Sequence, residues 1–309
     1  MCGRYVIASR VEIIEKRFRV KRNFDDFRPN YNVSPGELAP IITDDNPTSL
    51  QLAEFGFTPS WSKKKTYVFN ARAEGDRNKE NDPGYTGPMG IKDKPFFRNA
   101  IRYKRCLVIA DAFIEGTTKE RLSKPYLVYL RNKDRPFAFA GLWSEWTDKE
   151  TGEITKNFAI ITTTANELLA KIPHHRSPCI LPMNHFGNWI RNYGDDALSH
   201  VLPYIKQPYP ASLMNAYPIS AEIKRPRNND PSLLEPAGAR LEKEYELIHK
   251  KKTQLEGMGF SPARGKRNRT KAEEAQIQKQ QLLNDKLLNE FEAERRYFEG
   301  LEANDDLED

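Results

Sequence analysis

The sequence has few cysteines and no long apolar run. Its three cysteines, Cys2, Cys106 and Cys179, form no Cys-x-x-Cys pair, which argues against both a disulfide framework and a zinc site. No apolar run approaches the ~20 residues that a membrane-spanning helix needs, and the chain does not start with a positively charged segment followed by a short apolar one. We therefore expect an intracellular protein without a bound metal and without a membrane segment.

The charge of the chain is unevenly distributed. Residues 1–239 contain 35 Lys and Arg against 27 Asp and Glu, whereas residues 240–309 contain 14 against 16, within a net charge of +6. The basic surplus therefore lies in the N-terminal part of the chain. It favours a polyanion such as nucleic acid as the partner, although a diffuse surplus of this size can also serve solubility alone.

The order of apolar and turn segments predicts an α+β fold. Short strand-like segments recur along the first two-thirds of the chain, and only a few stretches have helical spacing. The expected strands are residues 3–8, 38–43, 50–57, 105–115, 125–130, 137–143, 158–164 and 213–220, and the expected helices are 11–18, 166–171, 183–193 and 195–202. Many short strands with few helices indicate a strongly bent, barrel-like mixed β-sheet with short flanking helices.

The composition changes near Pro226. From there to Thr270, proline, asparagine and basic residues dominate, which is typical of a linker with little fold of its own. Residues 271–300 then carry leucine and phenylalanine on one helical face, which predicts an amphipathic helix, either solvated or bound to a partner. We expect three parts, namely a domain at 1–225, a basic polar linker at 226–270 and a charged helical or disordered tail at 271–309.

The start of the chain carries unusual chemistry. Aminopeptidases remove Met1 when the second side chain is as small as a thiol, so we expect the mature chain to begin at Cys2. Its α-amine and thiol then form a 1,2-aminothiol, which can capture an aldehyde as a Schiff base and close it to a thiazolidine. The two groups ordinarily titrate at about pH 8 and 8.5, so a neighbouring acid-base group must assist at neutral pH. The alternative is a frayed terminus where cysteine occurs by chance.

Candidate acid-base groups follow later in the chain. Glu115 ends an apolar strand, where partial loss of hydration should raise its pKa toward the range of a general acid at neutral pH. Its alternative role is a salt bridge at a strand end. His174 lies in the corner between Pro173 and Pro178, where it could equally be held by a backbone carbonyl, and the adjacent His175 could face the site in its place.

Together these segments resemble the SOS-response-associated peptidase (SRAP) family, whose members crosslink themselves to abasic sites in single-stranded DNA. The resemblance covers roughly residues 2–225. The matching pieces are CGRY at 2–5, YNVSPG at 31–36, GFTPSW at 56–61, FNARAE at 69–74, the strand that ends in Glu115, and ITTTAN and HHRSPCIL between 161 and 181. Each piece is short, but their order and spacing make the set specific.

The resemblance implies roles for four residues. Cys2 is the crosslinking nucleophile, and Asn70 holds the terminal amine or the sugar. Glu115 is the acid-base carboxylate, and His174 donates a proton that helps to open the deoxyribose ring. The family also implies autoproteolytic removal of Met1, and a Schiff-base intermediate allows β-elimination as a secondary lyase activity.

Further residues are candidates for contacts with DNA. Guanidinium groups bind phosphate in a bidentate way, so three arginines in separate motifs are predicted phosphate contacts: Arg4, Arg72 and Arg176. Trp61, with Asn32 and Pro35, is predicted to stack on or wedge beside an unpaired base. We expect single-stranded DNA with abasic sites as the partner of a monomer without cofactor or metal. The location would be the cytoplasm, at the nucleoid, in a bacterium and the nucleus in a eukaryote.

The chain departs from the family pattern at three positions. Gly116 stands where Trp is common, Ser177 where Met is frequent, and Pro173 where Ile is usual.

Two other functions are alternatives to the one that the resemblance implies. An N-terminal-nucleophile amidotransferase also begins Met-Cys-Gly, but the Arg-His-Arg-Gly and Asn-Gly segments of glutaminase domains are missing from this sequence. A non-catalytic single-strand-binding module would keep its DNA binding with a blocked N-terminus, whereas a crosslinking enzyme would lose its reaction.

Overall fold

The computed structural model describes residues 3–131 and 135–243 of the 309-residue chain. Cys2 and the predicted tail at 271–309 lie outside the described residues, as does the predicted linker from residue 244 on. No helix in the described ranges has the length and apolar composition that crossing a membrane requires.

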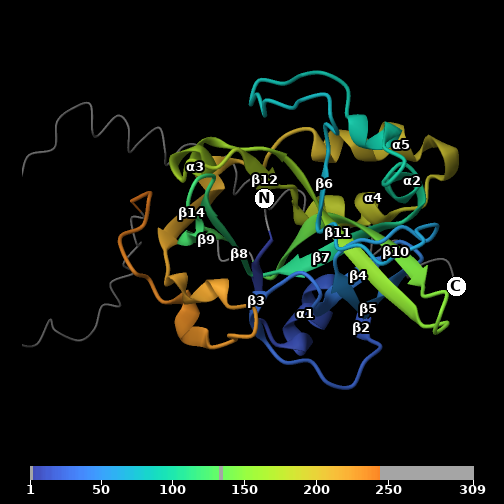
Figure 1. The fold of residues 1–309 in the computed structure, drawn as a ribbon, viewed down its shortest axis with the longest axis horizontal. Helices are drawn as coiled ribbons and strands as arrows, with labels where there is room; N and C mark the ends of the chain where they lie inside the picture. The colour runs from blue at the N-terminus through green and yellow to red at the C-terminus, as the bar shows by residue number, and fades with distance from the viewer. Residues whose placement is uncertain (1–2, 132–134, 244–309) are drawn as a thin grey trace, which may run out of the picture. The chain divides into compact units, whose positions relative to one another are not determined.

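Within the described residues the strands form two sheets (Figure 1). The first has five strands in the order β14-β9-β8-β1-β3, with bounds β1 (Tyr5–Ile7), β3 (Asn30–Val33), β8 (Ala112–Thr117), β9 (Arg121–Leu130) and β14 (Met214–Pro218). The second has the order β12-β11-β10-β7-β4-β5-β2, and β13 pairs with β10 and β6 with β11. Its strands are β2 (Lys21–Arg22), β4 (Leu38–Thr43), β5 (Asn46–Phe55), β6 (Asn70–Arg72), β7 (Arg105–Ala110), β10 (Phe137–Thr147), β11 (Ile154–Thr164), β12 (Arg176–Pro178) and β13 (Ile180–Leu181).

The second sheet closes on itself. β5 pairs in parallel with β11, where Glu54 lies opposite Asn157, so that β5, β4, β7, β10 and β11 form a ring. Most of the remaining pairs are antiparallel, which makes the sheet mixed. The predicted α+β fold with a barrel-like mixed sheet is therefore confirmed, and ring closure leaves these five strands without a free edge at the paired positions.

Short helices flank the sheets, as expected. They are α1 (Val11–Phe18), α2 (Ala100–Tyr103), α3 (Glu167–Lys171), α4 (Phe186–Ile190) and α5 (Ala197–Val201). The Asn166 side chain caps α3 by accepting from the backbone N–H of Leu169 at 3.0 Å. The helix predicted at 183–193 is shorter, because a 3₁₀ turn at Met183–His185 precedes α4. Figure 1 shows α2, α4 and α5 on one side of the barrel and α1 on the other.

The strand predicted at 105–115 is two strands in two sheets. β7 belongs to the barrel and β8 to the five-stranded sheet, and the chain passes between them at Asp111. The carboxylate of Asp111 accepts hydrogen bonds from the backbone N–H groups of Ala8 and Ser9 at 2.6 and 2.7 Å, and from the Ser9 hydroxyl at 2.6 Å. These contacts tie the crossover to the end of β1, and β8 then delivers Glu115 beside the N-terminal residues.

Tyr5 fixes the start of the chain to the barrel. Its side chain is fully buried, and its ring makes edge contacts with Phe55 and Phe139 at centroid distances of 5.5 and 6.0 Å. β1 also pairs with β3 and β8, so both sides of the strand are held. Gly3 and Arg4, which precede Tyr5, line a cavity together with residues of both sheets.

Residues 226–243 pack on the domain. Leu233, in the 3₁₀ turn Pro231–Leu234, is buried, and the N–H groups of Ala237 and Leu241 donate to carbonyls of β14 at 2.8 Å each. This part of the predicted linker is therefore folded, because it adds apolar contacts and backbone hydrogen bonds to the edge of the five-stranded sheet. The division of the chain at residue 225 stays a prediction.

Candidate functional site

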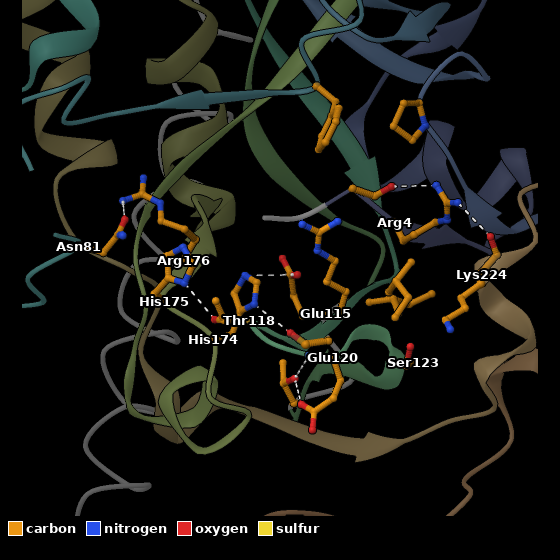
Figure 2. A pocket seen from close by; sticks show the side chains of 18 of the residues that line it. Arg4, Asn81, Glu115, Thr118, Glu120, Ser123, His174, His175, Arg176 and Lys224 are labelled. Carbon is orange, nitrogen blue, oxygen red and sulfur yellow. Dashed lines mark hydrogen bonds and ion pairs between the residues drawn. The ribbon is translucent and has the colours of Figure 1, made fainter. Parts of the chain in front are cut away.

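A cavity of about 880 Å³ lies between the N-terminal residues, the β8–β9 hairpin and β12 (Figure 2). Gly3 and Arg4 line it beside the hairpin, and Pro35 and Phe69 contribute from the turn after β3 and from the residue before β6. The cavity gathers cations from separate segments: Arg4, Arg72, Arg121, Arg176 and Lys224. An anionic ligand is the kind that such a lining favours.

Glu115 lines the cavity and is almost fully buried. It is the fourth residue of β8 and only 3% exposed, and β8 is paired on one side with β9 and on the other with β1. Burial raises the pKa of its carboxyl to about 7, the direction that the sequence predicts. Near neutral pH this side chain can therefore both hold and release a proton.

His174 faces Glu115. Its Nε2 lies 3.4 Å from Oε2 of the carboxyl group, and both side chains are buried. Its Nδ1 lies 2.9 Å from the carbonyl oxygen of Gly116; a carbonyl only accepts, so Nδ1 carries the proton and the Nε2 lone pair points at Glu115. Burial lowers the pKa of His174 to about 3, so at neutral pH the ring is uncharged and Glu115 is the member of the pair that gains and loses the proton.

His175 lies beside the pair without contacting the carboxyl group. Its ring stacks on that of His174 with a centroid distance of 5.4 Å and an interplanar angle of 13°. Its Nδ1 is 3.0 Å from the hydroxyl of Thr118, which itself donates to the carbonyl of Pro173 at 2.8 Å. Both rings line the cavity, but only His174 is oriented toward Glu115.

Arg72 and Arg176 lie together at one side of the cavity. Arg176 is buried and donates to Glu74 at 2.9 Å and to the carbonyl of Thr162 at 2.7 Å. Arg72 donates to Oδ1 of Asn81 at 2.9 Å, and Arg176 reaches the same oxygen at 3.5 Å. Burial and then the nearby charge of Arg176 lower the pKa of Arg72. One amide oxygen thus holds two guanidinium groups close together. The charge of Arg176 is paired with buried Glu74, whereas Arg72 is only partly buried and lines the cavity, where its guanidinium suits a phosphate.

Arg4 lines the cavity at another side. Its guanidinium donates to the carbonyls of Gly3 and Lys224 at 3.2 and 3.5 Å, and burial lowers its pKa. Pro35, in the turn after β3, lines the cavity as well. These two predicted DNA contacts therefore lie in the same cavity as Glu115 and His174.

Three predicted site residues lie outside the cavity lining. Asn70, in β6, donates to the carbonyl of Phe69, its neighbour that does line the cavity. Asn32 is fully buried, and its amide donates to the carbonyls of Arg225 and Asn228 at 2.9 and 3.0 Å, so it clamps the chain after β14. Trp61 is 59% exposed and rests edge-on against Phe96. Their assignments to the sugar or a base stay predictions.

The β8–β9 hairpin also belongs to the cavity, although the sequence does not predict it as part of the site. Residues 117, 118 and 120–123 all line the cavity. A Cβ on Gly116 would lie 1.8 Å from the carbonyl oxygen of Arg121, and the pairing register shifts at this point. A tryptophan at position 116, which is common in the family that the sequence resembles, would therefore not fit this hairpin. The signal available in the sequence was the charged run Lys119-Glu120-Arg121 directly after the strand that carries Glu115.

Comparisons with known proteins identify the family of the chain. A family model described as SOS response associated peptidase (SRAP) matches residues 1–226. The abasic site processing protein YoqW of Bacillus subtilis is 33% identical over 244 residues, covering 76% of this chain and 99% of that protein. The abasic site processing protein HMCES of Gallus gallus is 26% identical over 269 residues, covering 74% of this chain and 72% of that protein.

A solved structure shares the fold. The crystal structure of a protein from Bacteroides thetaiotaomicron matches with a TM-score of 0.64 at 25% identity, covering 77% of this chain and all of that one. The family model spans most of the chain, and its matched range contains the cavity from Gly3 to Lys224. The chain belongs to the SOS response associated peptidase family.

Proposed function

We propose that this protein processes abasic sites in single-stranded DNA by a covalent crosslink between Cys2 and the ring-opened aldehyde, which shields the lesion. The observation that carries the proposal is the buried Glu115–His174 pair in a cationic cavity whose lining begins at Gly3. Cys2 directly precedes Gly3, so its amine and thiol are one residue away from that lining. The names of the relatives, abasic site processing proteins, support the same substrate.

The reaction begins with the sugar. An abasic deoxyribose is mostly a closed hemiacetal, and it opens when the C1′ hydroxyl loses a proton while the ring oxygen gains one. Because its pKa is about 7, Glu115 is protonated in part of the molecules at neutral pH, and His174 Nε2 presents a lone pair toward it, so the pair can take one proton and supply the other. The product is an aldehyde at C1′ and a hydroxyl at C4′.

Capture follows in two steps. The amine of Cys2 attacks C1′ to give a carbinolamine, which loses water to form an imine when Glu115 protonates the departing hydroxyl. The thiol then adds to the imine carbon, and its proton ends on the amine nitrogen, which closes the thiazolidine. In competition, loss of the C2′ proton from the imine expels the 3′ phosphate, and this β-elimination is the secondary lyase activity. Met1 must leave first, by autoproteolysis or by an aminopeptidase.

The remaining candidates hold the strand. Arg4, Arg72 and Arg176 are suited to phosphates, and Trp61 has an exposed ring on which a base could stack. Asn70 holds the terminal amine or the sugar. A single strand can splay to bring C1′ into the cavity, whereas duplex stacking hides that carbon. The protein acts on DNA as a monomer without a cofactor.

A denaturant-stable adduct tests the proposal. The protein is incubated with a single-stranded oligonucleotide that contains one abasic site, and the product is resolved on a denaturing gel and by intact mass. We expect the summed masses of DNA and Met1-free protein less one water. Cys2→Ala should give no stable adduct, and Cys2→Ser a weaker one. No adduct from the unmodified protein, or an equal yield from Cys2→Ala, would overturn the proposal; hydrolysis of glutamine would favour the amidotransferase alternative.

A further inference from the structure

The cavity carries positive charge on two sides of the Glu115–His174 pair. Figure 2 shows Arg176 and His175 on one side of the pair, and Arg4 and Lys224 on the other. The predicted phosphate contacts Arg72 and Arg176 share Asn81 and so occupy a single side. Arg4, the third predicted phosphate contact, lies on the opposite side, and its guanidinium already donates to the carbonyls of Gly3 and Lys224.

Two cations that line the cavity have no local counterion among the described residues. Arg121, in the β8–β9 hairpin, and Lys224, at the end of the 3₁₀ turn Ala221–Lys224, are both exposed and line the cavity, and neither forms an ion pair with any described residue. The negative charge of Glu120, next to Arg121, is already paired within the hairpin. Glu120 accepts from the Thr117 hydroxyl and from Lys124 at 2.9 Å, contacts that lower its pKa to about 2.

The backbone holds Arg121 at this place. Arg121 has a left-handed conformation with φ of 53°, and its carbonyl oxygen is so close to Gly116 that any side chain there would collide with it. Gly116 directly follows Glu115, so the close approach sets the turn against the reacting centre. The backbone at Lys224 is held by two residues from the start of the chain. The Asn32 amide donates to the carbonyl of the adjacent Arg225, and Arg4 donates to the carbonyl of Lys224 itself.

We propose that Arg121 and Lys224 form a second phosphate subsite, which binds the backbone phosphate on the opposite side of the abasic nucleotide from the phosphate bound by Arg72. The inference rests on the proposed function. Guanidinium suits a phosphodiester through two parallel hydrogen bonds, and the ammonium group of Lys224 adds a point charge. Binding both flanking phosphates positions C1′ next to Glu115 and His174. Binding only one of them would leave C1′ free to move away from the pair.

Binding of an unreactive substrate tests the subsite. The probe is a single-stranded oligonucleotide with one tetrahydrofuran abasic analogue, which lacks the aldehyde and forms no crosslink. Arg121→Ala should weaken binding about tenfold and should reduce the slope of log affinity against log salt by about 0.7. Lys119→Ala is the matched control, because it removes one positive charge from the same hairpin at an exposed residue outside the cavity lining. Equal effects of the two substitutions would overturn the subsite.

Neutral linkages then identify the phosphate. A methylphosphonate replaces one phosphate that flanks the analogue, on either side in turn. We expect the Arg121→Ala effect to vanish with one of these probes and the Arg72→Ala effect to vanish with the other. Loss of both effects with the same probe would overturn the inference. The proposed function fails separately, in the crosslinking assay. If no adduct forms but Arg121→Ala still weakens binding of the analogue, the proposed function is wrong and the subsite is not. If the adduct forms normally but Arg121→Ala does not weaken binding, the subsite alone is refuted.

Discussion

Replacing Glu115 by glutamine should stabilise the fold above neutral pH while removing the acid of the proposed reaction. The ordinary pKa of this carboxyl is 4.5, and burial raises it to about 7 in the folded protein. Between these two values the folded state binds more protons than the unfolded state, so the free energy of unfolding falls as the pH rises from 4.5 to 7. Glutamine is neutral at every pH and avoids this loss.

The magnitude follows from the size of the pKa shift. Each pKa unit is worth about 1.4 kcal/mol, so ionising buried Glu115 costs the folded state about 3 kcal/mol by pH 8. His174 has the opposite dependence: its pKa is lowered from 6.5 to about 3, so its contribution is lost as the pH falls through that range. The His174 contribution is common to both proteins and cancels in their difference.

Denaturant unfolding at pH 4 and pH 8 measures this difference. The two proteins should have nearly equal free energies of unfolding at pH 4, and Glu115→Gln should be more stable by about 3 kcal/mol at pH 8. Glu120→Gln is the matched control on the same hairpin. Thr117 and Lys124 hold the Glu120 pKa at about 2, so its stabilising effect is present above 4.5 and is lost toward pH 2. The control should therefore never exceed the unmodified protein in stability.

A difference between Glu115→Gln and the unmodified protein that stays constant from pH 4 to pH 8 would refute the reasoning, since it would place the Glu115 pKa near its ordinary value. A gain at pH 4 that disappears at pH 8 would refute it more directly, because the sign would be reversed. The crosslinking rate of Glu115→Gln at pH 7 should fall while its stability rises.

Three further outcomes are expected. His174→Ala should slow crosslinking by about 10² to 10⁴ and leave DNA affinity within a few-fold, whereas His175→Ala should change the rate little. The rates of adduct formation of the two variants are compared. If His175→Ala is the slow variant, the roles of the two histidines are the reverse of those proposed. Arg72→Ala should flatten the salt dependence of single-strand binding by about 0.7, and an unchanged slope from fluorescence titration would exclude a phosphate contact. Crosslinking should be faster on single-stranded than on fully paired abasic DNA, and equal rates in a matched time course would point to a protein that reads free aldehydes.

Local patterns were enough to predict the fold class, because each strand of the barrel has its own apolar run. The break at Asp111 could not be read in the same way, since its cause is a set of hydrogen bonds from Ala8 and Ser9, about a hundred positions earlier in the chain. The sequence predicts one strand there, and only the partner segments show that the chain changes sheets.

The candidate site shows the same limit. Glu115 and His174 could be singled out by motif, and their separation of 3.4 Å depends on the hairpin and the α3 corner coming together. The sequence predicts Asn32, with Trp61 and Pro35, beside an unpaired base, which stays a prediction; it does not predict that the Asn32 amide donates to the carbonyls of residues 225 and 228. A side chain's partner that lies nearly two hundred residues away leaves no trace in local sequence.

The cavity is assembled from both ends of the domain, and this has a consequence for synthesis of the protein. Gly3 leaves the ribosome first, but the opposite wall needs Lys224, and Glu115 and His174 are made in between. At typical elongation rates the last wall residue is added roughly ten to fifty seconds after the first. Throughout that interval the nascent chain lacks at least one wall of the cavity. Under the proposed function, newly made chains should therefore be slow to react with the aldehydes of the cell until the domain is complete.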